Sequence, residues 1–497
     1  MMEPRSVSPK RHGRKTGHKV VLACGLFVPV LSGPLFVSPA SAAGPVTAVT
    51  AEPSTLAECA TGAISSTNPQ PKDLGNGVKL YQADCSAGPW RVRILTVNPK
   101  ATGASAEVTM ARPGKITDLK YLSDLIPKGT AIAGVNGGYF VRDIWVNDHL
   151  GTAGESAGLS VDRGEVLSEA TNGRAVLALY DGGRGAKVQK LTSTIKMTVT
   201  NGGKTLFTSG DASGTPWIDG LNRPPGEIRN CGGADDVASS SDNTAVAAPW
   251  HDHTCVDDDE LVLLTSRFGS PRPGSTTSGP SAGTEIVMDT TGNVLEVLGS
   301  RGGPVTASGA ATFLQGTEGN DKYATWLRNL KKGDKVTYTV TLTDDAKKEV
   351  KLTGRDSIVN GGPVLVRNGA VTDLAAEYKA DGLDRMSNKD SWIGPNPRTL
   401  VGLRTSGEIL LVTVDKKNAA VKAGPVGATI AEAAATMKAL GVQDAINLDG
   451  GGSTTMVTGG TVVNHPSDKS VDSNIDFAES ARRAQRLVAD AVVITAK

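Results

Sequence analysis

Short runs in which apolar and polar residues alternate dominate the chain from Gly77 onward. Alternation with a period of two is typical of a β-strand that buries one face. It predicts strands at 78–81, 90–97, 285–288 and 336–342. The stretch 270–283 is rich in Pro, Gly and Ser and is predicted to be a loop.

One segment has the periodicity of a helix instead. Thr429 and Glu432 have the spacing of a capping box, which satisfies backbone N–H groups at a helix start. Apolar residues then follow at helical spacing, and Gly441 stands where a left-handed C-terminal cap belongs. The pattern predicts a helix between Thr429 and Gly441.

The composition favours strands joined by tight turns. The chain has 497 residues, with 59 glycines and only 4% aromatic residues. Its 52 Lys and Arg nearly balance its 51 Asp and Glu, which argues against a strongly basic protein that binds nucleic acid. We therefore expect an α+β fold, with a largely antiparallel β-sheet core crossed by a few helices, in one large domain over 56–497.

The first residues have the composition of a secretory signal peptide. Six basic residues precede the apolar stretch 20–37, and Ala40-Ser41-Ala42 supplies the small residues of a cleavage site. We predict a signal peptide over 1–42, a flexible leader over 43–55 and a secreted mature protein with no membrane-spanning segment. An uncleaved membrane anchor is the alternative.

Four cysteines remain after the predicted signal peptide: Cys59, Cys85, Cys231 and Cys255. An even number in an exported chain indicates disulfides, and three pairings are possible. Pairing between neighbours in the sequence is the simplest, with Cys59 bonded to Cys85 and Cys231 to Cys255. The second pair would enclose most of a polar insertion at about 229–260.

This insertion contains His251, Asp252, His253 and the acidic run 257–260. His-x-His and clustered carboxylates can bind metal ions, but the spacing matches neither a zinc motif nor a calcium loop. A solvated acidic loop is the favoured interpretation, and a structural divalent metal remains an alternative.

One pattern recurs three times and carries candidate chemistry. An apolar run leads into Asn136-Gly137-Gly138, another into Asn360-Gly361-Gly362, and a third through Asn447 into Asp449-Gly450-Gly451-Gly452-Ser453. Glycine permits positive φ and close approach to the backbone, and successive N–H groups in such turns can form an anion-binding nest. Simple hairpin turns are the competing interpretation, and they account for Asn368-Gly369 and Gly459-Gly460.

These turns belong to a wider resemblance. The blocks at 135–140, 396–399, 432–434, 447–453 and 464–468 resemble the phosphodiester glycosidase family, in order and between about 131 and 494. The family has one Arg shortly before its last strand, whereas this chain offers Arg482, Arg483 and Arg486. The Cys231–Cys255 insertion has no counterpart in the family.

The resemblance implies cleavage of a sugar C1–O bond in a sugar-1-phosphate diester, within a single catalytic domain that needs no cofactor. Its candidate catalytic carboxylates are Asp449 and Glu432, and its candidate phosphate clamp is Arg398. The remaining candidate substrate-binding residues are those of the turns: Asn136, Gly137, Asn360, Gly361, Gly450, Gly451 and Ser453.

Each of these residues also has a purely structural interpretation. Glu432 can serve only the capping box, the asparagines can cap turns, and Arg398 can form a salt bridge. Two other functions also stay open: a phosphoric diester hydrolase that cuts P–O, and a glycan-binding protein without catalysis.

Overall fold

The structure is a computed structural model. It describes residues 54–66, 70–142, 152–171, 173–210, 216–226, 228–229, 237–238, 254–256, 260–276, 279–317, 322–383, 389–417, 423–469 and 477–497, which all belong to one compact unit. The predicted signal peptide, almost all of the predicted leader and most of the insertion at 229–260 lie outside the described residues.

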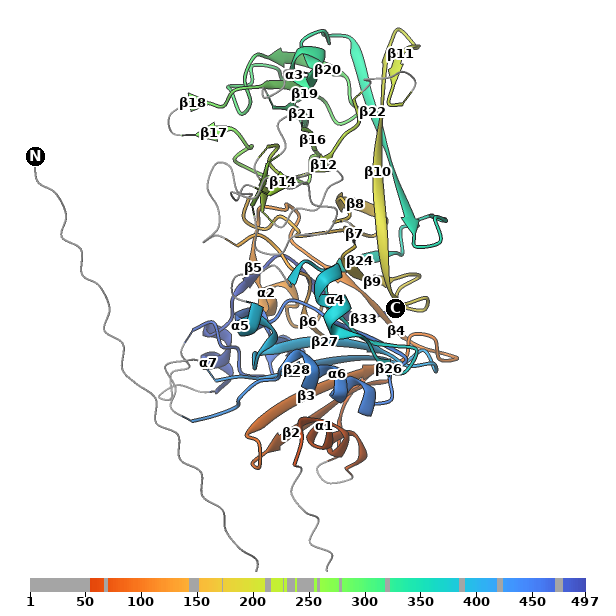
Figure 1. Cartoon of the computed structure of the whole chain (residues 1–497), viewed down its shortest axis with the longest axis vertical. Helices are drawn as coiled ribbons and strands as arrows, with labels where there is room; N and C mark the ends of the chain where they lie inside the picture. The colour runs from red at the N-terminus through yellow and green to blue at the C-terminus, as the bar shows by residue number, and fades with distance from the viewer. Residues whose placement is uncertain are drawn as a thin grey trace, which may run out of the picture. The chain divides into compact units, whose positions relative to one another are not determined.

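Two large sheets organise the fold (Figure 1). The first has the order β1 (Lys72–Gly75), β2 (Val78–Cys85), β3 (Trp90–Val97), β28 (Ile409–Val414), β27 (Arg398–Leu403), β29 (Asp444–Asn447), β25 (Val364–Arg367), β26 (Ala370–Val371). The second has the order β23 (Glu349–Val350), β22 (Asp334–Asp344), β10 (Lys187–Asn201), β9 (Ala175–Leu179), β24 (Ser357–Asn360), β7 (Ser160–Asp162), β8 (Glu165–Ser168), with β11 (Lys204–Thr208) on β10.

Two five-stranded sheets complete the architecture. The third sheet has the order β12 (Gly220–Leu221), β16 (Leu261–Leu264), β21 (Thr312–Gly316), β19 (Thr284–Met288), β20 (Val294–Leu298). The fourth has the order β31 (Thr461–Val462), β30 (Met456–Thr458), β6 (Ala133–Asn136), β33 (Ala491–Ala496), β4 (Ala106–Ala111). Among the strand pairs of the described residues, only β12 with β16 is parallel, which confirms the predicted antiparallel core.

The remaining elements are short. A small three-stranded sheet has the order β13 (Ile228–Arg229), β15 (Thr254–Val256), β14 (Val237–Ala238). The strand pairs are β17 (Ser275–Thr276) with β18 (Gly279–Pro280), and β5 (Lys120–Tyr121) with β32 (Leu487–Val488). The helices are α1 (Leu56–Ser65), α2 (Leu122–Leu125), α3 (Lys322–Leu327), α4 (Leu374–Ala380), α5 (Lys389–Ile393), α6 (Ile430–Ala439) and α7 (Phe477–Arg483). None of the helices in the described part of the chain is long and apolar enough to cross a membrane.

The predicted strands are confirmed. The expected segments at 78–81, 90–97, 285–288 and 336–342 lie within β2, β3, β19 and β22. The stretch 270–283 is mostly irregular, as predicted, but it also contains the small β17–β18 pair.

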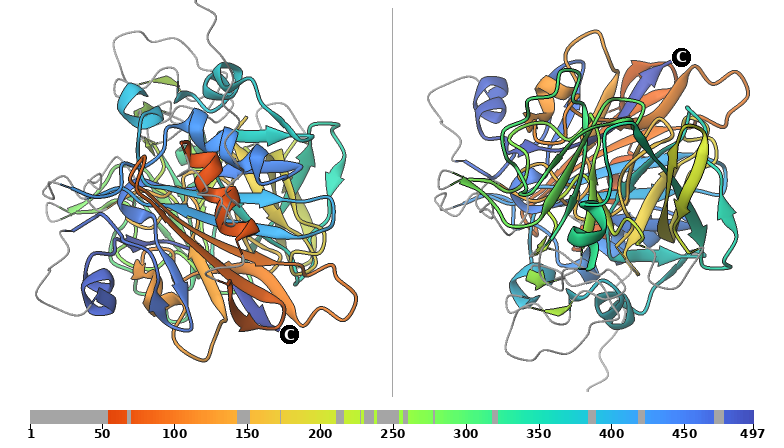
Figure 2. Two further views of the ribbon diagram at one scale, coloured as in Figure 1. Left: turned by 90° about the horizontal axis from the view of Figure 1, so that it is seen from below. Right: turned by 90° about the horizontal axis from the view of Figure 1, so that it is seen from above.

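The predicted helix is α6, and both hydrogen bonds of its capping box are present. Gly441 follows it with φ +72°, in the left-handed conformation expected of a C-terminal cap. Figure 2 shows α6 beside α1 across one face of the first sheet, and their apolar residues share one buried cluster with β3, β27 and β28. Because α1 also begins with a capping box, at Thr55 and Glu58, both covering helices start with satisfied backbone donors.

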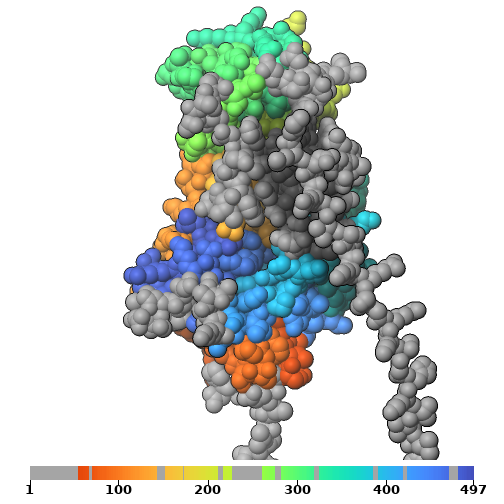
Figure 3. Space-filling model, turned by 60° about the vertical axis from the view of Figure 1, so that its left-hand side comes forward, coloured from red at the N-terminus to blue at the C-terminus, as the bar shows by residue number. Residues whose placement is uncertain are grey.

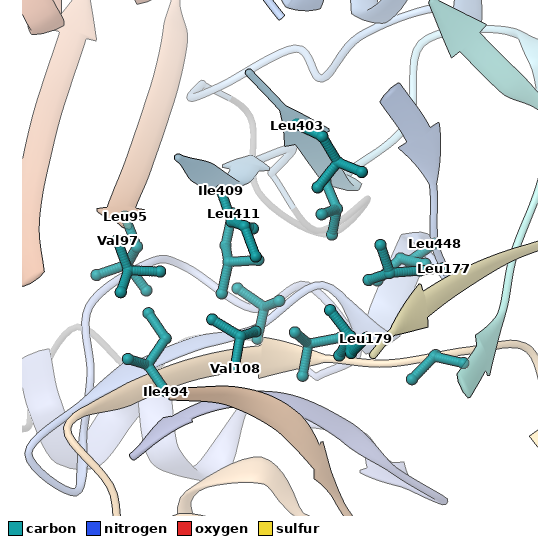
Figure 4. Close-up of a cluster of buried hydrophobic side chains, with 14 of the residues drawn as sticks. Leu95, Val97, Val108, Leu177, Leu179, Leu403, Ile409, Leu411, Leu448 and Ile494 are labelled. Carbon is teal, nitrogen blue, oxygen red and sulfur yellow. The ribbon is translucent and has the colours of Figure 1, made fainter. Parts of the chain in front are cut away.

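The main core lies on the opposite face of the first sheet. Side chains from β3, β27 and β28 point toward those of β4, β9 and β33 in Figure 4, where Leu95, Leu411 and Ile494 are among the labelled residues. The apolar contact thus joins the first sheet to parts of the second and fourth. This packing holds together strands that are far apart in the sequence.

A second apolar cluster belongs to the third sheet. It combines residues of β16, β19 and β21 with the inward faces of β10 and β22, including Ile195, Met197 and Val336. In Figure 3 the green segment that contains β16–β21 lies at one end of the described unit, away from the orange strands β2 and β3.

One disulfide joins Cys59 of α1 to Cys85 at the end of β2. It confirms the first predicted pairing. The predicted Cys231–Cys255 bond falls outside the described residues, because Cys231 and the side chain of Cys255 are not among them.

Replacing both Cys59 and Cys85 by Ala should destabilise the protein. The bond closes a loop with a sequence separation of 26, which corresponds to about 3 kcal/mol in the chain-entropy model. Urea unfolding should show this decrease in the free energy of unfolding. An unchanged midpoint would mean that the α1–α6 packing alone keeps α1 on the sheet.

Candidate active site

The three glycine turns meet at one place in the fold. They follow β6, β24 and β29, which end at Asn136, Asn360 and Asn447 and have buried ends. The N–H of Asp449 donates to the carbonyl oxygen of Gly137 at 3.1 Å, and the N–H of Gly362 donates to that of Asn447 at 2.8 Å. Backbone hydrogen bonds therefore connect the third turn to each of the other two.

The predicted substrate-binding asparagines hold these turns together. Asn136 donates through Nδ2 to the carbonyl oxygen of Asp449 at 2.7 Å, and its Oδ1 accepts from the Thr399 hydroxyl at 2.6 Å. Asn360 makes two hydrogen bonds with the backbone of Tyr139, at 3.0 and 3.1 Å. Both asparagines are buried and cap these turns, and their function in substrate binding stays a prediction.

The glycines serve close packing more than positive φ. A Cβ on Gly137 would lie 2.0 Å from Asp490 Oδ1, and one on Gly450 would lie 2.8 Å from the carbonyl oxygen of Pro397. Only Gly362 and Gly451 have the backbone conformation that disfavours a side chain, with φ +139° and +58°.

Three N–H groups of the glycine turns are engaged within the protein. The N–H groups of Gly137, Gly361 and Gly451 all donate to backbone carbonyl oxygens of the protein itself. A nest requires N–H groups that are open to a ligand. These three donors are therefore not open to a ligand, and a nest formed by the other N–H groups of the turns stays a prediction.

Asp449 is a candidate carboxyl group whose pKa is shifted by its surroundings. It is partly exposed, and withdrawal of its carboxyl group from water raises its pKa to about 6. The charge of Arg486 is the strongest influence in the other direction, followed by hydrogen bonds from Ser453 and the Gly450 N–H. A carboxyl group that titrates near pH 6 beside a cation is suited to acid–base or nucleophilic chemistry.

The structure resolves which of the three late arginines belongs to this site. Arg486 donates through Nε to Asp468 at 2.7 Å and through Nη1 to Ser453 Oγ at 3.4 Å. Arg482 and Arg483 instead form salt bridges with Glu479 within helix α7. Arg486 is therefore the arginine near Asp449, and Ser453 is a buried link between them.

The Glu432 side chain is not brought together with these residues. It is exposed, and its Oε2 accepts from the N–H of Thr429 at 2.8 Å and from the Thr429 hydroxyl at 2.9 Å. Both contacts belong to the capping box of α6. The side chain has no contact with Asp449, and a catalytic function of Glu432 stays a prediction.

Arg398 is buried against backbone carbonyl oxygens. Its Nε donates to Ala428 at 2.9 Å, and one terminal nitrogen donates to Trp392 and Gly394, both at 2.7 Å. Burial lowers its pKa to about 10. Among the described residues Arg398 forms no salt bridge, the structural alternative considered for it, and its guanidinium instead joins the α5 loop to the start of α6. Its function as a phosphate clamp stays a prediction.

A polar cluster around Tyr139 was not predicted from the sequence. The Tyr139 hydroxyl donates to the carbonyl oxygen of Gly362 and accepts from Asn447 Nδ2, each at 2.7 Å. Burial raises the pKa of Tyr139 well above its usual range; the charges of Asp449 and Asp381 act in the same direction, and those of Arg398 and Arg174 oppose them. Four charged groups thus surround one buried phenol.

Asp381 and Arg174 are the unexpected members of this cluster. Asp381 is fully buried, and neither of its carboxyl oxygens has a hydrogen-bond partner within the described ranges. Burial raises the pKa of Asp381 to about 7, although the charge of Arg174 opposes the increase. Their only sequence signals, an Asp after a helix and an isolated Arg, are too common to indicate a site.

Most of the candidate metal-binding residues lie outside the described part of the chain. In the part of the chain that the structure describes, no three His, Cys, Asp or Glu residues are grouped so that they could hold a metal ion. The residues proposed for such a site, His251, Asp252, His253 and 257–259, lie outside that part. Glu260 is described, and it is buried in a salt bridge with Arg223.

Part of the chain matches a known protein family. Residues 282–495 match the family model for phosphodiester glycosidases, which confirms the resemblance found in the sequence. The matched region is less than half of the chain, but it contains Asp381, Arg398, Glu432, Asp449, Ser453 and Arg486. No curated protein matched the sequence.

Solved structures share the fold. A Burkholderia pseudomallei K96243 protein described as exported has 27% identity and a TM-score of 0.63, with 83% of this chain and 75% of that chain covered. A hypothetical protein from Synechocystis has 16% identity and a TM-score of 0.54, with coverages of 86% and 63%.

A third structure is the catalytic domain of zebrafish N-acetylglucosamine-1-phosphodiester alpha-N-acetylglucosaminidase, auto-inhibited by its pro-peptide. It has 14% identity, coverages of 84% and 82%, and a TM-score of 0.35.

Replacing Asp381 by Asn should reduce the loss of stability with rising pH. The pKa of the Asp381 carboxyl group is about 7 in the folded protein and has the ordinary value of 3.8 in the unfolded chain. The proton on Asp381 therefore favours folding at low pH, and this contribution to stability is lost as the pH rises from 3.8 toward about 7. Between these two pH values the free energy of unfolding of the variant should rise, relative to that of the wild type, by up to about 1.4 kcal/mol per pH unit. Urea unfolding at a series of pH values would measure the difference.

The matched control is Asp345→Asn, which removes an exposed carboxylate in the turn between β22 and β23. It should leave the slope unchanged. Equal slopes for the wild type and Asp381→Asn would show that Asp381 is ionised in the folded protein throughout this range.

Proposed function

We propose that this protein is an exported phosphodiester glycosidase that cleaves the sugar C1–O bond of a sugar-1-phosphate diester. The products are the free sugar and a phosphomonoester. One observation carries the proposal. A partly exposed carboxyl group with a pKa of about 6, Asp449, lies beside Arg486 and Ser453 within the segment that matches the phosphodiester glycosidase family.

The chemistry of the substrate makes such a site sufficient. The leaving group of a sugar-1-phosphate diester is a phosphomonoester, which is already a stabilised anion. It needs less help from a general acid than the alcohol released in ordinary glycoside hydrolysis. Neutralisation of the phosphate charge becomes more important, and Arg486 supplies a partly exposed cation close to Asp449.

Asp449 has the properties of the base or nucleophile in this reaction. Above about pH 6 its carboxyl group is ionised, as attack on the sugar or activation of a water molecule requires. The turn contacts with Asn136 and Gly137 hold its backbone. Activity that depends on this carboxylate should therefore rise as the pH passes 6.

Export is part of the proposal. The basic and apolar composition of residues 1–42 supports a signal peptide, and the Cys59–Cys85 disulfide suits an oxidising compartment. The similarity to a protein described as exported agrees with both. Phosphate-linked glycans outside the cell are the substrate class that this location favours.

Asp449→Asn should abolish turnover of an N-acetylglucosamine-1-phosphodiester. Asn keeps the size of the side chain but cannot act as base or nucleophile, so we expect kcat to fall on the order of a hundredfold or more. Release of reducing sugar and of phosphomonoester should be measured together, and both should be lost. Equal turnover by Asp449→Asn and wild type would contradict the assignment.

Glu432→Gln is the matched variant for the second predicted carboxylate. Gln is also accepted in a capping box, so α6 should remain intact while the charge is removed. Because the Glu432 carboxylate is engaged by Thr429, we expect this variant to keep its activity. A loss comparable to that of Asp449→Asn would show that Glu432 is the second catalytic carboxylate.

The position of bond cleavage should follow from solvent labelled with oxygen-18. C1–O cleavage by water places the label in the released sugar, whereas P–O cleavage places it in the phosphate. We expect the label in the sugar, measured by mass spectrometry of both products. Label in the phosphate would assign a phosphoric diester hydrolase, and failure to turn over any diester in a panel would favour a glycan-binding protein.

A further inference from the structure

The third glycine of the Asp449 turn lies against the guanidinium of Arg486. A Cβ built on Gly452 would collide with Arg486 Nη2, and it would lie 2.7 Å from Arg486 Cζ and 2.5 Å from Asp468 Oδ1. Gly452 does not have the positive φ that favours glycine. The absence of a side chain at this position therefore serves the close approach of the guanidinium and not the backbone conformation.

Asp468 binds the same guanidinium. Its Oδ1 accepts from Arg486 Nε at 2.7 Å, and the two side chains have exposed fractions of 22% and 20%. The two chain segments also meet through their backbones, since the N–H of Lys469 donates to the carbonyl oxygen of Ala484 at 3.3 Å. An ion pair of this exposure contributes little to stability, so fixing the direction of Arg486 is its main consequence.

The segment that carries Asp468 is itself fixed to the chain that follows the Asp449 turn. The buried Asn464 side chain donates to the carbonyl oxygen of Thr454 at 3.1 Å and accepts from the N–H of Met456 at 2.7 Å. Its amide also donates to the buried Asp415 carboxylate at 2.9 Å. The Asp468 carboxylate therefore extends from a backbone with a defined position beside the site.

Arg486 in turn controls the surroundings of Asp449. Among the described residues, the charged and titratable groups that interact with Asp449 are Arg486, Arg142 and the Tyr139 phenol. The charge of Arg486 is the strongest of the influences that oppose the rise in the pKa of Asp449 caused by burial. The position of one guanidinium therefore sets much of the electrostatics of this carboxyl group.

We propose that Gly452 and Asp468 position the Arg486 guanidinium, so that its charge stays beside Asp449 and its Nη2 is directed to the phosphate of the substrate. The inference rests on the proposed function. Within the described residues Nη2 has no hydrogen-bond partner, so this donor is left for a phosphate oxygen. Asp468 acts through Arg486 and is a positioning residue, not a second catalytic carboxylate. A guanidinium that is already fixed loses less side-chain entropy when the substrate binds.

Two substitutions displace the guanidinium by different routes. Asp468→Ala removes its hydrogen-bond acceptor, whereas Gly452→Ala places a methyl group where the guanidinium lies and leaves every charge in place. Both should raise the pKa of Asp449 above its value of about 6, by about one pH unit. Both should also lower kcat/KM for an N-acetylglucosamine-1-phosphodiester roughly tenfold, as expected for one weakened charged hydrogen bond.

Carbon-13 NMR of the full chain, labelled at its aspartate carboxyl groups, measures the pKa of Asp449 without turnover. The signal is assigned by its loss in Asp449→Asn. This titration separates the two proposals. If the wild type turned over no diester, the proposed function would be wrong, but the pKa of Asp449 would still show whether Asp468 positions Arg486.

Glu479→Ala is the matched control. Glu479 also forms salt bridges with two neighbouring arginines, Arg482 and Arg483, but neither is among the groups that most affect the pKa of Asp449. Its removal should leave this pKa and kcat/KM unchanged. Asp468→Glu keeps a carboxylate acceptor for Nε, so it should retain most of the activity that Asp468→Ala loses.

The direction of the change in pKa decides the outcome. If Asp468 acted only through its own charge, Asp468→Ala would lower the pKa of Asp449, and a fall or no change would overturn the proposal. In the Arg486→Gln background Asp468→Ala should have no further effect, and an undiminished second loss of kcat/KM would also overturn it. If Asp468→Ala does not fold, an unchanged pKa of Asp449 in Gly452→Ala has the same consequence.

Discussion

The hydrogen bonding between three glycine turns is the constraint on which the site depends. Asn136, Asn360 and Asn447 each end a buried strand, and each uses its side-chain amide to hold a neighbouring segment of backbone. The glycines allow this approach, because a Cβ at Gly137, Gly138 or Gly361 would collide with the adjoining turn or with Asp490. The fourth sheet, the second sheet and the first sheet are joined here, and Asp449 is held at the junction.

Burial of charge is the second feature of this junction. Asp449, Asp381, Arg398 and Arg174 all affect the pKa of Tyr139, and burial disfavours the charged form of each. Such an arrangement costs stability in the absence of a ligand. Groups of this kind are common where a protein binds or transforms a charged substrate. Burial of these charged groups therefore accounts both for the cost in stability and for the properties that the proposed chemistry uses.

Much of the fold followed from local patterns. Period-two alternation identified β2, β3, β19 and β22, and one capping box identified α6, because these signals arise from neighbours in the sequence. Pairing between neighbours in the sequence was the simplest of three possibilities, and the Cys59–Cys85 disulfide confirms it for that pair. The family blocks in the C-terminal half of the chain identified a resemblance that the family model confirms.

The sequence by itself determined the antiparallel strand content, the capping of α6 and the phosphodiester glycosidase motifs. Only the tertiary structure decided which polar groups find hydrogen-bond partners within the protein. In the folded protein the amides of Asn136 and Asn360 are hydrogen-bonded to backbone groups, and the Glu432 carboxylate belongs to a helix cap. Arg486 is the one of the three arginines that lies near Asp449. The tertiary structure also brought Arg174 and Asp381 to Tyr139. Partners separated by hundreds of residues meet only when the sheets pack, so no local pattern can specify them.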